Sequence, residues 1–312
     1  MDLRVLTYQP SIQREWDAFI GTAKNGHFFF QRGYLEYHNQ RFKDASLLVL
    51  FRERIVAVLP ANVCDGAVLS HQGLTFGGFL VNHAMTGSLM IAVFEAIIDH
   101  LRAQGIHRII YKAMPHIYHR EPSEEDLYAL HRLGARIIRR DLSSALELGG
   151  ALSYSKGKQR NLSKARKHEL MVTRGYDFKD FMALVEQVLD TRHGTRPTHT
   201  ATEIQMLANR FPEHIRLYCA YEHRDLLAGV VLFVNPTVVH TQYLANSDSG
   251  LNFGALDFLL DALITREFPT WEYLSFGIST ESDGRVLNEG LLHSKEAFGA
   301  RGIVHDTYEI SL

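Results

Sequence analysis

The stretch NSDSGLNFGA, residues 246–255, places small polar residues and two glycines between a strand pattern and a helix pattern. Residues 237–244 are mostly β-branched or aromatic, and residues 256–264 carry one apolar stripe at helical spacing. Free backbone N–H groups at the start of a helix bind anions such as phosphate. The stretch is therefore either a phosphate-binding loop or an ordinary helix start with Asn252 as its N-cap.

A second stretch, KGKQRNLSKARK at residues 156–167, contains six lysines or arginines and no acidic residue. It stands out in a chain whose formal net charge is −2. Lys158 and Arg160 could contact a phosphate, a diphosphate or the 3′ end of an RNA. The alternative is a solvated helix face, which is what most charge runs form.

A third stretch, FGISTESDGR at residues 276–285, follows a strand that the sequence predicts to be buried. An active site on such a sheet would open at this strand end. Glu281 is the first candidate for a general base and Asp283 the second, because a carboxylate can deprotonate an amine directly or through one water. The run Ser282-Asp283-Gly284 is equally typical of a turn.

The composition describes a globular chain of 312 residues, 46% of them hydrophobic, which is long enough for two ordinary domains. The near-neutral charge predicts no DNA partner. The cysteines at positions 64 and 219 and the 17 histidines show no metal-ligand spacing, so no metal is expected.

The N-terminus does not resemble a signal peptide, and no apolar run approaches the roughly 20 residues that span a bilayer. The sequence therefore predicts a cytoplasmic protein without a transmembrane segment.

The strand and helix patterns occur in the same order in both halves of the chain: β, α, α, three strands, then α, β, α, β. This repetition predicts an α/β (α+β) fold of two related domains, residues 1–145 and 146–312. Each would contain a mixed, mostly antiparallel sheet with helices on its faces.

This order resembles the GNAT acyltransferase fold, and two such modules in tandem resemble the FemABX-like family. That family includes aminoacyl-tRNA-dependent transferases of peptidoglycan synthesis and acetyltransferase-like proteins. The resemblance is carried by HQGLTFGGFLV (71–81), PHIYHREPSEEDLYAL (115–130), SYSKGKQRNLSKARK (153–167), HTQYLANSDSGLNFGALDFLLDALI (240–264) and FGISTESDGRVLNEGLLHSKEAFGARGIVHDTYEI (276–310).

The GNAT resemblance implies that a loop and the following helix start in the second half hold the pyrophosphate of the donor. The residues in this role would be Gly250, Asn252, Phe253, Gly254 and Ala255. The loop lacks the Arg or Gln that begins the family pattern Q/R-x-x-G-x-G/A. The corresponding glycines of the first half, at 73, 77 and 78, could belong to a vestigial donor loop, an acceptor groove or simple turns.

Lys295 lies in a K-x-x-F-G arrangement that resembles the closing motif of the family, and could hold a phosphate or a developing oxyanion. The alternative is a surface lysine near a helix end. GNAT enzymes often carry a tyrosine on this helix, expected at residues 285–298, to protonate the leaving group. Residues 285–298 contain no tyrosine, so Tyr308 or Tyr243 would take that role. The candidates for acceptor binding are Lys158, Arg160, His199, Tyr243 and Asn288.

Together these features predict an N-acyltransferase that forms an amide on an amino sugar or peptide of a cell-envelope precursor. Acetyl-CoA or another acyl-CoA would bind in the second half, and the acceptor would be a small or lipid-linked anionic substrate. One alternative is a FemABX-type transferase that binds the 3′ end of an aminoacyl-tRNA. The other is a non-catalytic module that binds anionic sugar nucleotides.

Overall fold

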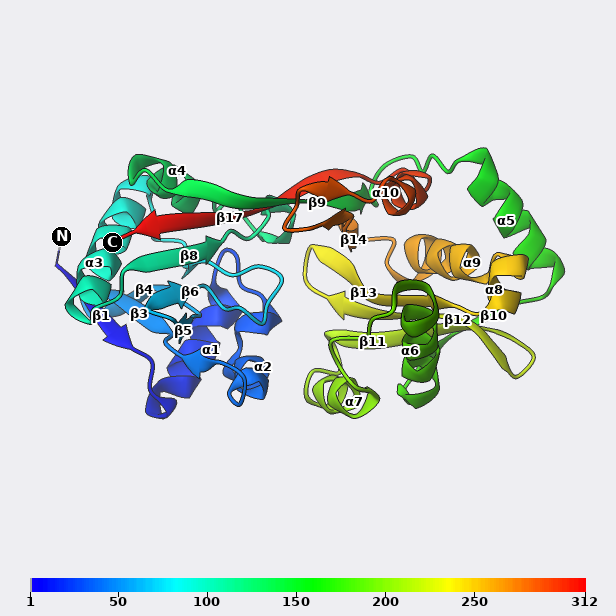
Figure 1. The fold of residues 1–312 in the computed structure, drawn as a ribbon, viewed down its shortest axis with the longest axis horizontal. Helices are drawn as coiled ribbons and strands as arrows, with labels where there is room; N and C mark the ends of the chain where they lie inside the picture. Colours follow the sequence, from blue (N-terminus) through cyan, green and yellow to red (C-terminus); the bar gives the residue numbers. More distant parts are fainter. Residues whose placement is uncertain (1) are drawn as a thin grey trace. The chain divides into compact units, whose positions relative to one another are not determined.

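The structure is a computed structural model that describes residues 2–312, and the chain divides into two compact units (Figure 1). Unit 1 contains the chain up to Leu142 together with residues 280–286 and 304–312, and unit 2 contains residues 143–279 and 287–303. The expected boundary at 145/146 lies three residues from this division. The expected halves are contiguous, however, whereas two C-terminal segments of the chain belong to unit 1.

The strands of unit 1 form two groups. A four-stranded antiparallel sheet has the order β1 (Leu3–Thr7), β3 (Leu47–Phe51), β4 (Arg54–Leu59), β7 (Leu80–Val81). A second group has the order β17 (Arg301–Ser311), β8 (Arg108–Lys112), β6 (Ala67–Leu69), β5 (Asn62–Cys64), β2 (Lys43–Asp44). Strand β17 and strand β9 (Arg136–Glu147) each contribute residues to both units.

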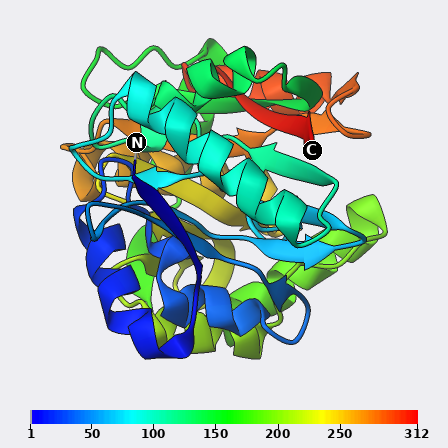
Figure 2. The same cartoon turned by 90° about the vertical axis from the view of Figure 1, so that its left-hand side faces the viewer.

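The helices of unit 1 are α1 (Gln13–Thr22), α2 (Arg32–Leu35), α3 (Gly87–Ala103) and α4 (Glu125–Arg132), with short 3₁₀ turns at Pro10–Ile12, Phe28–Phe30, Glu36–His38 and His116–Tyr118. Helix α3 is the longest, and Figure 2 shows it in front of the strands. Its apolar stripe, including Val93, Phe94 and Ile97, packs on residues of β3, β4 and β8 to form the core. Amphipathic spacing therefore fixes which side of α3 faces the sheet.

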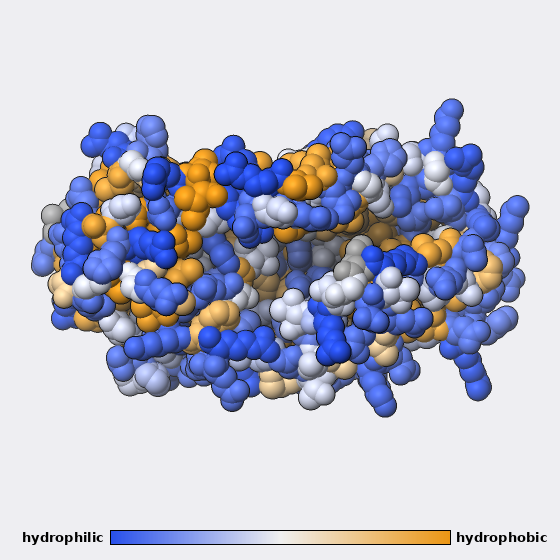
Figure 3. Space-filling model, viewed as in Figure 1, coloured by the Kyte–Doolittle hydropathy of each residue, from blue (hydrophilic) through white to orange (hydrophobic). Residues whose placement is uncertain are grey.

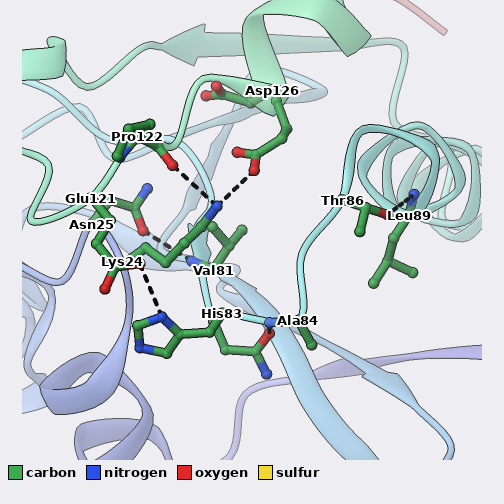
Figure 4. Close-up of polar contacts among 12 residues, drawn as sticks. Lys24, Asn25, Val81, His83, Ala84, Thr86, Leu89, Glu121, Pro122 and Asp126 are labelled. Carbon is green, nitrogen blue, oxygen red and sulfur yellow. Dashed lines mark hydrogen bonds and ion pairs between the residues drawn. The ribbon is translucent and has the colours of Figure 1, made fainter.

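Two side chains shortly after α1 make long-range polar contacts in unit 1 (Figure 4), and that of Asn25 pairs with the edge of β7. The Asn25 side chain accepts from the N–H of Val81 at 3.0 Å and donates to the carbonyl of Phe79 at 2.8 Å, as a neighbouring strand would. Lys24 Nζ donates to the Pro122 carbonyl and pairs with Glu125 at 2.6 Å.

Unit 2 contains one continuous sheet. Its order is β10 (Met171–Gly175), β11 (Ile215–Glu222), β12 (Asp225–Val234), β13 (Val238–Asn246), β14 (Tyr273–Ile278) and the end of β9. All neighbours are antiparallel except β13 and β14, which run parallel. The predicted class, mixed and mostly antiparallel sheets flanked by helices, is confirmed in both units.

Helices cover both faces of this sheet (Figure 1). One face carries α5 (Lys156–Lys167), α8 (Asp248–Phe253) and α9 (Ala255–Ala262), which continues as one π-helical turn, Leu263–Glu267. The other carries α6 (Lys179–His193) and α7 (Ala201–Arg210), and α10 (Glu289–Glu296) follows β16. Strands β15 (Thr280–Glu281) and β16 (Val286–Leu287) form a hairpin.

Helix α8 begins earlier than predicted. Its N-cap is Ser247, whose hydroxyl accepts from the N–H of Gly250 at 3.0 Å. The prediction that Asn252 caps this helix is wrong, because Asn252 lies within α8. The left-handed Gly254, with φ of 73°, ends α8 and begins α9. The structure therefore has two helices where the sequence predicted one.

Within residues 2–312, no helix combines the length and the apolar character needed to cross a membrane.

Two buried histidines of unit 1, His71 and His305, and the half-buried His119 predict a loss of stability in acid. Burial lowers the pKa of His71 to about 3, and that of His119 and His305 to about 4. Because an unfolded chain binds these protons near pH 6.5, the free energy of unfolding should fall as pH drops from about 6.5 to 4, by up to about 1.4 kcal/mol per pH unit for each histidine. Buried Asp126, whose pKa is raised to about 6, acts in the opposite direction but is a single group.

The measurement is urea unfolding between pH 7.5 and 4.5 in a Trp271→Phe background, where buried Trp16 is the only remaining tryptophan and reports on unit 1. His305→Leu should flatten the pH dependence, whereas His131→Gln, an exposed residue of α4, should not. An unchanged slope in His305→Leu would contradict the prediction.

Gly250 should tolerate no side chain. A Cβ there would lie 2.2 Å from Asn246 Oδ1 and 2.3 Å from the Leu227 carbonyl, whereas a Cβ at Gly290 of α10 has only one neighbour, at 3.8 Å. Gly250→Ala should destabilise unit 2 by about 1–3 kcal/mol through overpacking. Gly290→Ala should be neutral or stabilise it by up to about 1 kcal/mol. Urea unfolding followed by Trp271 fluorescence in a Trp16→Phe background compares the two.

Candidate functional site

The central feature of unit 2 is the parting of its two parallel strands. β13 and β14 pair only where Val238, Val239 and His240 face residues 273–275. Beyond this point β13 bulges, because Gln242 has no partner in the register with β12. β14 also becomes irregular, at the left-handed Gly277 with φ of 72°. Bulges re-aim strands and often lie next to active sites.

A cavity of about 320 Å³ lies where the strands part. Both strands contribute to its wall, β13 through Leu244 and Asn246 and β14 through Phe276. Helices provide the rest: Lys158, Asn161, Leu251, Gly254, Leu256, Asp257, Leu260, Leu291, Ser294, Lys295 and Phe298. The cavity is thus mainly apolar with a few polar groups, as small-molecule sites usually are.

Lys295 is the buried cation of this cavity. Its Nζ donates to the carbonyls of Gly277 and Ile278, at 2.8 and 2.7 Å, and to Ser279 Oγ at 2.8 Å. Its side chain has no carboxylate within ion-pair distance among the described residues, and burial lowers its pKa to about 8. Lys295 is therefore not the surface lysine of the alternative interpretation, since only 6% of it is exposed.

The predicted donor loop lies at the junction of α8 and α9, and packing explains its glycines. The position of a Cβ on Gly250 is filled by Asn246 and Leu227, and that on Gly254 lies 2.8 Å from the carbonyl oxygen of Asn161 in α5. Asn252 is exposed, and Phe253 stacks on His168 with ring centroids 4.0 Å apart. Ala255 is buried at the start of α9, which has no side-chain cap. Phosphate binding by this loop stays a prediction.

The basic stretch divides into an inner and an outer part. Lys158 faces inward, where its Nζ pairs with Asp257 at 2.7 Å and lies 4.2 Å from the centre of the Phe298 ring. Arg160 and the other basic residues of α5 are exposed, and hydrophilic residues cover this region in Figure 3. Leu162 and Ala165 provide the buried side of the helix. Of the basic residues in this stretch, the structure brings only Lys158 into the cavity wall.

Two further acceptor candidates, His199 and Tyr243, form a buried pair. The Tyr243 hydroxyl lies 2.7 Å from His199 Nδ1 and also accepts from the His199 N–H. Burial raises the pKa of Tyr243. Because side chains alternate along β13, Tyr243 points away from the face that carries Leu244 and the cavity.

Asn288 is the N-cap of α10 and accepts from the N–H of Leu291 at 3.0 Å. The helix expected over 285–298 thus begins only after Asn288, because β16 occupies the preceding residues.

The candidates Glu281, Asp283 and Tyr308 belong to unit 1 and do not line the cavity. Glu281 is exposed on β15, and Asp283 lies in the β15–β16 turn with φ of 54°, where Arg139 pairs with it at 2.9 Å. This is the turn role that the sequence offered for Asp283. Tyr308, whose pKa is raised by burial and by Asp306, lies on β17.

In unit 1, the glycine-rich loop between β6 and β7 is closely packed. A Cβ on Gly77 would lie 1.9 Å from the Ser70 carbonyl, and one on Gly78 would lie 2.6 Å from the Tyr111 hydroxyl. That hydroxyl accepts from the Phe79 N–H and donates to Asp126 at 2.6 Å. These contacts agree with the interpretation of the loop as structural turns.

Sequence reasoning missed two polar side chains of unit 2. His240 is half-buried at the last paired position of β13, with Nδ1 3.1 Å from Ser275 Oγ and its ring beside Gly277. Asp257 is a buried acid within the apolar stripe of α9. An acid at a core position of a helix was the available signal for Asp257, whereas a histidine in a strand carries no such signal.

The sequence matches no protein-family model and no curated protein. The structure is similar to a crystal structure of FemX, with a TM-score of 0.70 at 12% identity, covering 99% of this chain and 97% of that one. It is also similar to the C-terminal domain of a putative lysylphosphatidylglycerol synthetase from Agrobacterium fabrum (TM-score 0.62, 13% identity, 97% and 92% covered).

A tandem GNAT protein from the clavulanic acid biosynthesis pathway matches with a TM-score of 0.51 at 12% identity, over 99% of this chain and 98% of that chain. At these identities the likeness establishes the fold. The chain therefore has the tandem GNAT fold that its sequence predicts.

Proposed function

We propose that this protein is an acyl- or aminoacyltransferase that forms an amide on an amino group of a cell-envelope precursor. The observation that carries the proposal is the cavity between β13 and β14, which both strands line and which contains a buried lysine. The similarity to FemX and to a tandem GNAT protein supports it.

The parted strands suit an extended donor. Beyond His240, β13 continues for six residues without pairing to β14, so that edge offers backbone N–H and C=O groups to a ligand. A donor arm that carries amides can pair with such an edge as an added strand would. Its reactive carbonyl would then be held at a fixed place, and such positioning lowers the barrier of a bimolecular reaction.

The chemistry needs three events. The amine nitrogen of the acceptor attacks the carbonyl carbon of the donor, the bond from that carbon to sulfur or oxygen breaks, and a base takes the proton that the amine releases. Negative charge develops on the carbonyl oxygen. The buried Lys295, whose N–H groups donate to three protein oxygen atoms, would favour this charge through its own positive charge.

Two donors fit this scheme, an acyl-CoA and an aminoacyl ester at the 3′ end of a tRNA. Both present a carbonyl to an amine. The exposed basic face of α5 supports a phosphate-bearing partner in either case. The acceptor would be a small or lipid-linked anionic molecule.

Lys295 predicts a specific pH profile. A role for the ammonium form means that kcat should fall as pH rises through about 8, the lowered pKa of Lys295. Lys295→Arg should keep a positive charge and remove this fall, since arginine stays protonated. Lys295→Met should lower kcat by about 10²-fold or more at pH 7.

The measurement is kcat against pH from 6.5 to 9.5 for the three proteins, with circular dichroism as the check on folding. An alkaline fall of kcat that persists unchanged in Lys295→Arg would exclude Lys295 as its source.

The base in our proposal is His240, which belongs to unit 2 and lies where β13 and β14 part. Glu281, the base that the sequence predicts, belongs to unit 1 and does not line the cavity. His240→Asn should lower kcat by about 10²- to 10⁴-fold while leaving donor binding intact. Glu281→Gln is the control and should keep most of the activity. Normal turnover in His240→Asn together with a comparable loss in Glu281→Gln would return the role to the carboxylate.

A further inference from the structure

The start of α9, where the fold would bind a donor phosphate, already contains a carboxylate of the chain itself. Asp257 is the third residue of α9, and only 8% of it is exposed. Its two oxygens accept from Lys158 Nζ and from Asn161 Nδ2, each at 2.7 Å. A negative side chain in the first turn of a helix interacts favourably with the partial positive charge there. Asp257 thus takes the place that the helix terminus offers to an anion.

Further oxygen atoms surround this position. The carbonyl oxygen of Asn161 lies against Gly254, 2.8 Å from where its Cβ would be. Asn246 Oδ1, in the wall of the same cavity, is buried and has no hydrogen-bond partner among the described residues. Both oxygen atoms pack against the glycines that precede α9, and a Cβ on Gly250 would lie 2.2 Å from Asn246 Oδ1. Acceptor atoms therefore surround the start of α9, which disfavours the approach of phosphate oxygens.

Lys158, the cation that the described residues place at this position, is paired with Asp257. Lys158 is largely buried, and its charge is compensated by the carboxylate rather than left for a ligand. A diphosphate entering here would therefore gain no net attraction from Lys158 or from the helix start, and it would bring a second anion next to the carboxylate of Asp257. A group that opposes the wrong ligand is a general means of specificity.

We propose that Asp257 is a specificity residue that excludes phosphate from the start of α9. On the proposed transferase function, on which this inference rests, the cavity accepts a donor arm with N–H groups and without a diphosphate at this position. Coenzyme A, whose diphosphate would lie here, is then a poor ligand of the wild-type protein.

The test compares the wild type with Asp257→Asn, which keeps the shape and a hydrogen-bonding side chain but removes the charge. Glu289→Gln, an exposed acid in the first turn of α10, is the control for a general change of net charge in unit 2. The ligands are coenzyme A and the phosphate-free thioester S-acetyl-N-acetylcysteamine, with Kd measured by isothermal titration calorimetry.

Asp257→Asn should bind coenzyme A at least about tenfold more tightly than the wild type, because Lys158 becomes available to phosphate. Glu289→Gln should not. The affinity for the phosphate-free thioester should be similar in all three proteins. Equal coenzyme A affinity in the wild type and Asp257→Asn, or no binding by either, would overturn the role of Asp257.

Failure of the transferase proposal has a different signature. If no protein binds the phosphate-free thioester but Asp257→Asn gains coenzyme A binding, Asp257 excludes phosphate and the cavity is not a thioester site. If Asp257→Asn does not fold, a double variant Lys158→Met/Asp257→Leu replaces the ion pair by apolar groups. Because it removes the carboxylate without leaving a free lysine, it should bind coenzyme A more tightly than the wild type, and an unchanged affinity would overturn the role of Asp257.

Discussion

The parting of β13 and β14 is the constraint on which the rest of unit 2 depends. Parallel neighbours normally continue their hydrogen bonds along the sheet, and leaving them unmade costs free energy unless the freed groups find other partners. Here Lys295 takes the carbonyls of Gly277 and Ile278, so the strand end of β14 is satisfied by a side chain. The same lysine that provides charge to the cavity therefore also keeps the cavity open.

Helix α5 forms a wall of this cavity because of two contacts of opposite kinds. Leu162 and Ala165 bury its narrow apolar side, and the ion pair between Lys158 and Asp257 fixes its first turns at the start of α9. A buried ion pair adds little net stability compared with apolar residues, but it strongly penalises any arrangement that separates the two charges. It therefore specifies where α5 sits more than it strengthens the fold.

The two units have a similar order of elements, and each contains a lysine that contacts main-chain carbonyls, but the surroundings of the two lysines differ. In unit 1 the Tyr111 hydroxyl fills the space beside Gly78, and Lys112 Nζ donates to three carbonyls of the loop at residues 71–74. Burial lowers the pKa of Lys112 to about 8, as it does for Lys295. Both units thus contain a lysine that holds main-chain carbonyls, but of the two only Lys295 lines the cavity of unit 2.

The sequence by itself determined the order of elements, because apolar periodicity records which side of each helix and strand is buried. It predicted the helix at 156–167, the strand at 237–244 and the duplicated α/β organisation to within a few residues. It also singled out Lys295, since K-x-x-F-G is a local pattern.

Only the tertiary structure decided which polar residues meet. The return of residues 280–286 and 304–312 to unit 1 places Glu281, Asp283 and Tyr308 there, and no local pattern records such long-range pairing. Ser247 rather than Asn252 caps α8 because Gly250 must pack against Leu227 of the sheet. Asp257 and Lys158 lie 99 residues apart in the chain, and they meet because α5 packs on α9. The sequence fixes each residue's chemistry, but packing over long separations chooses its partner.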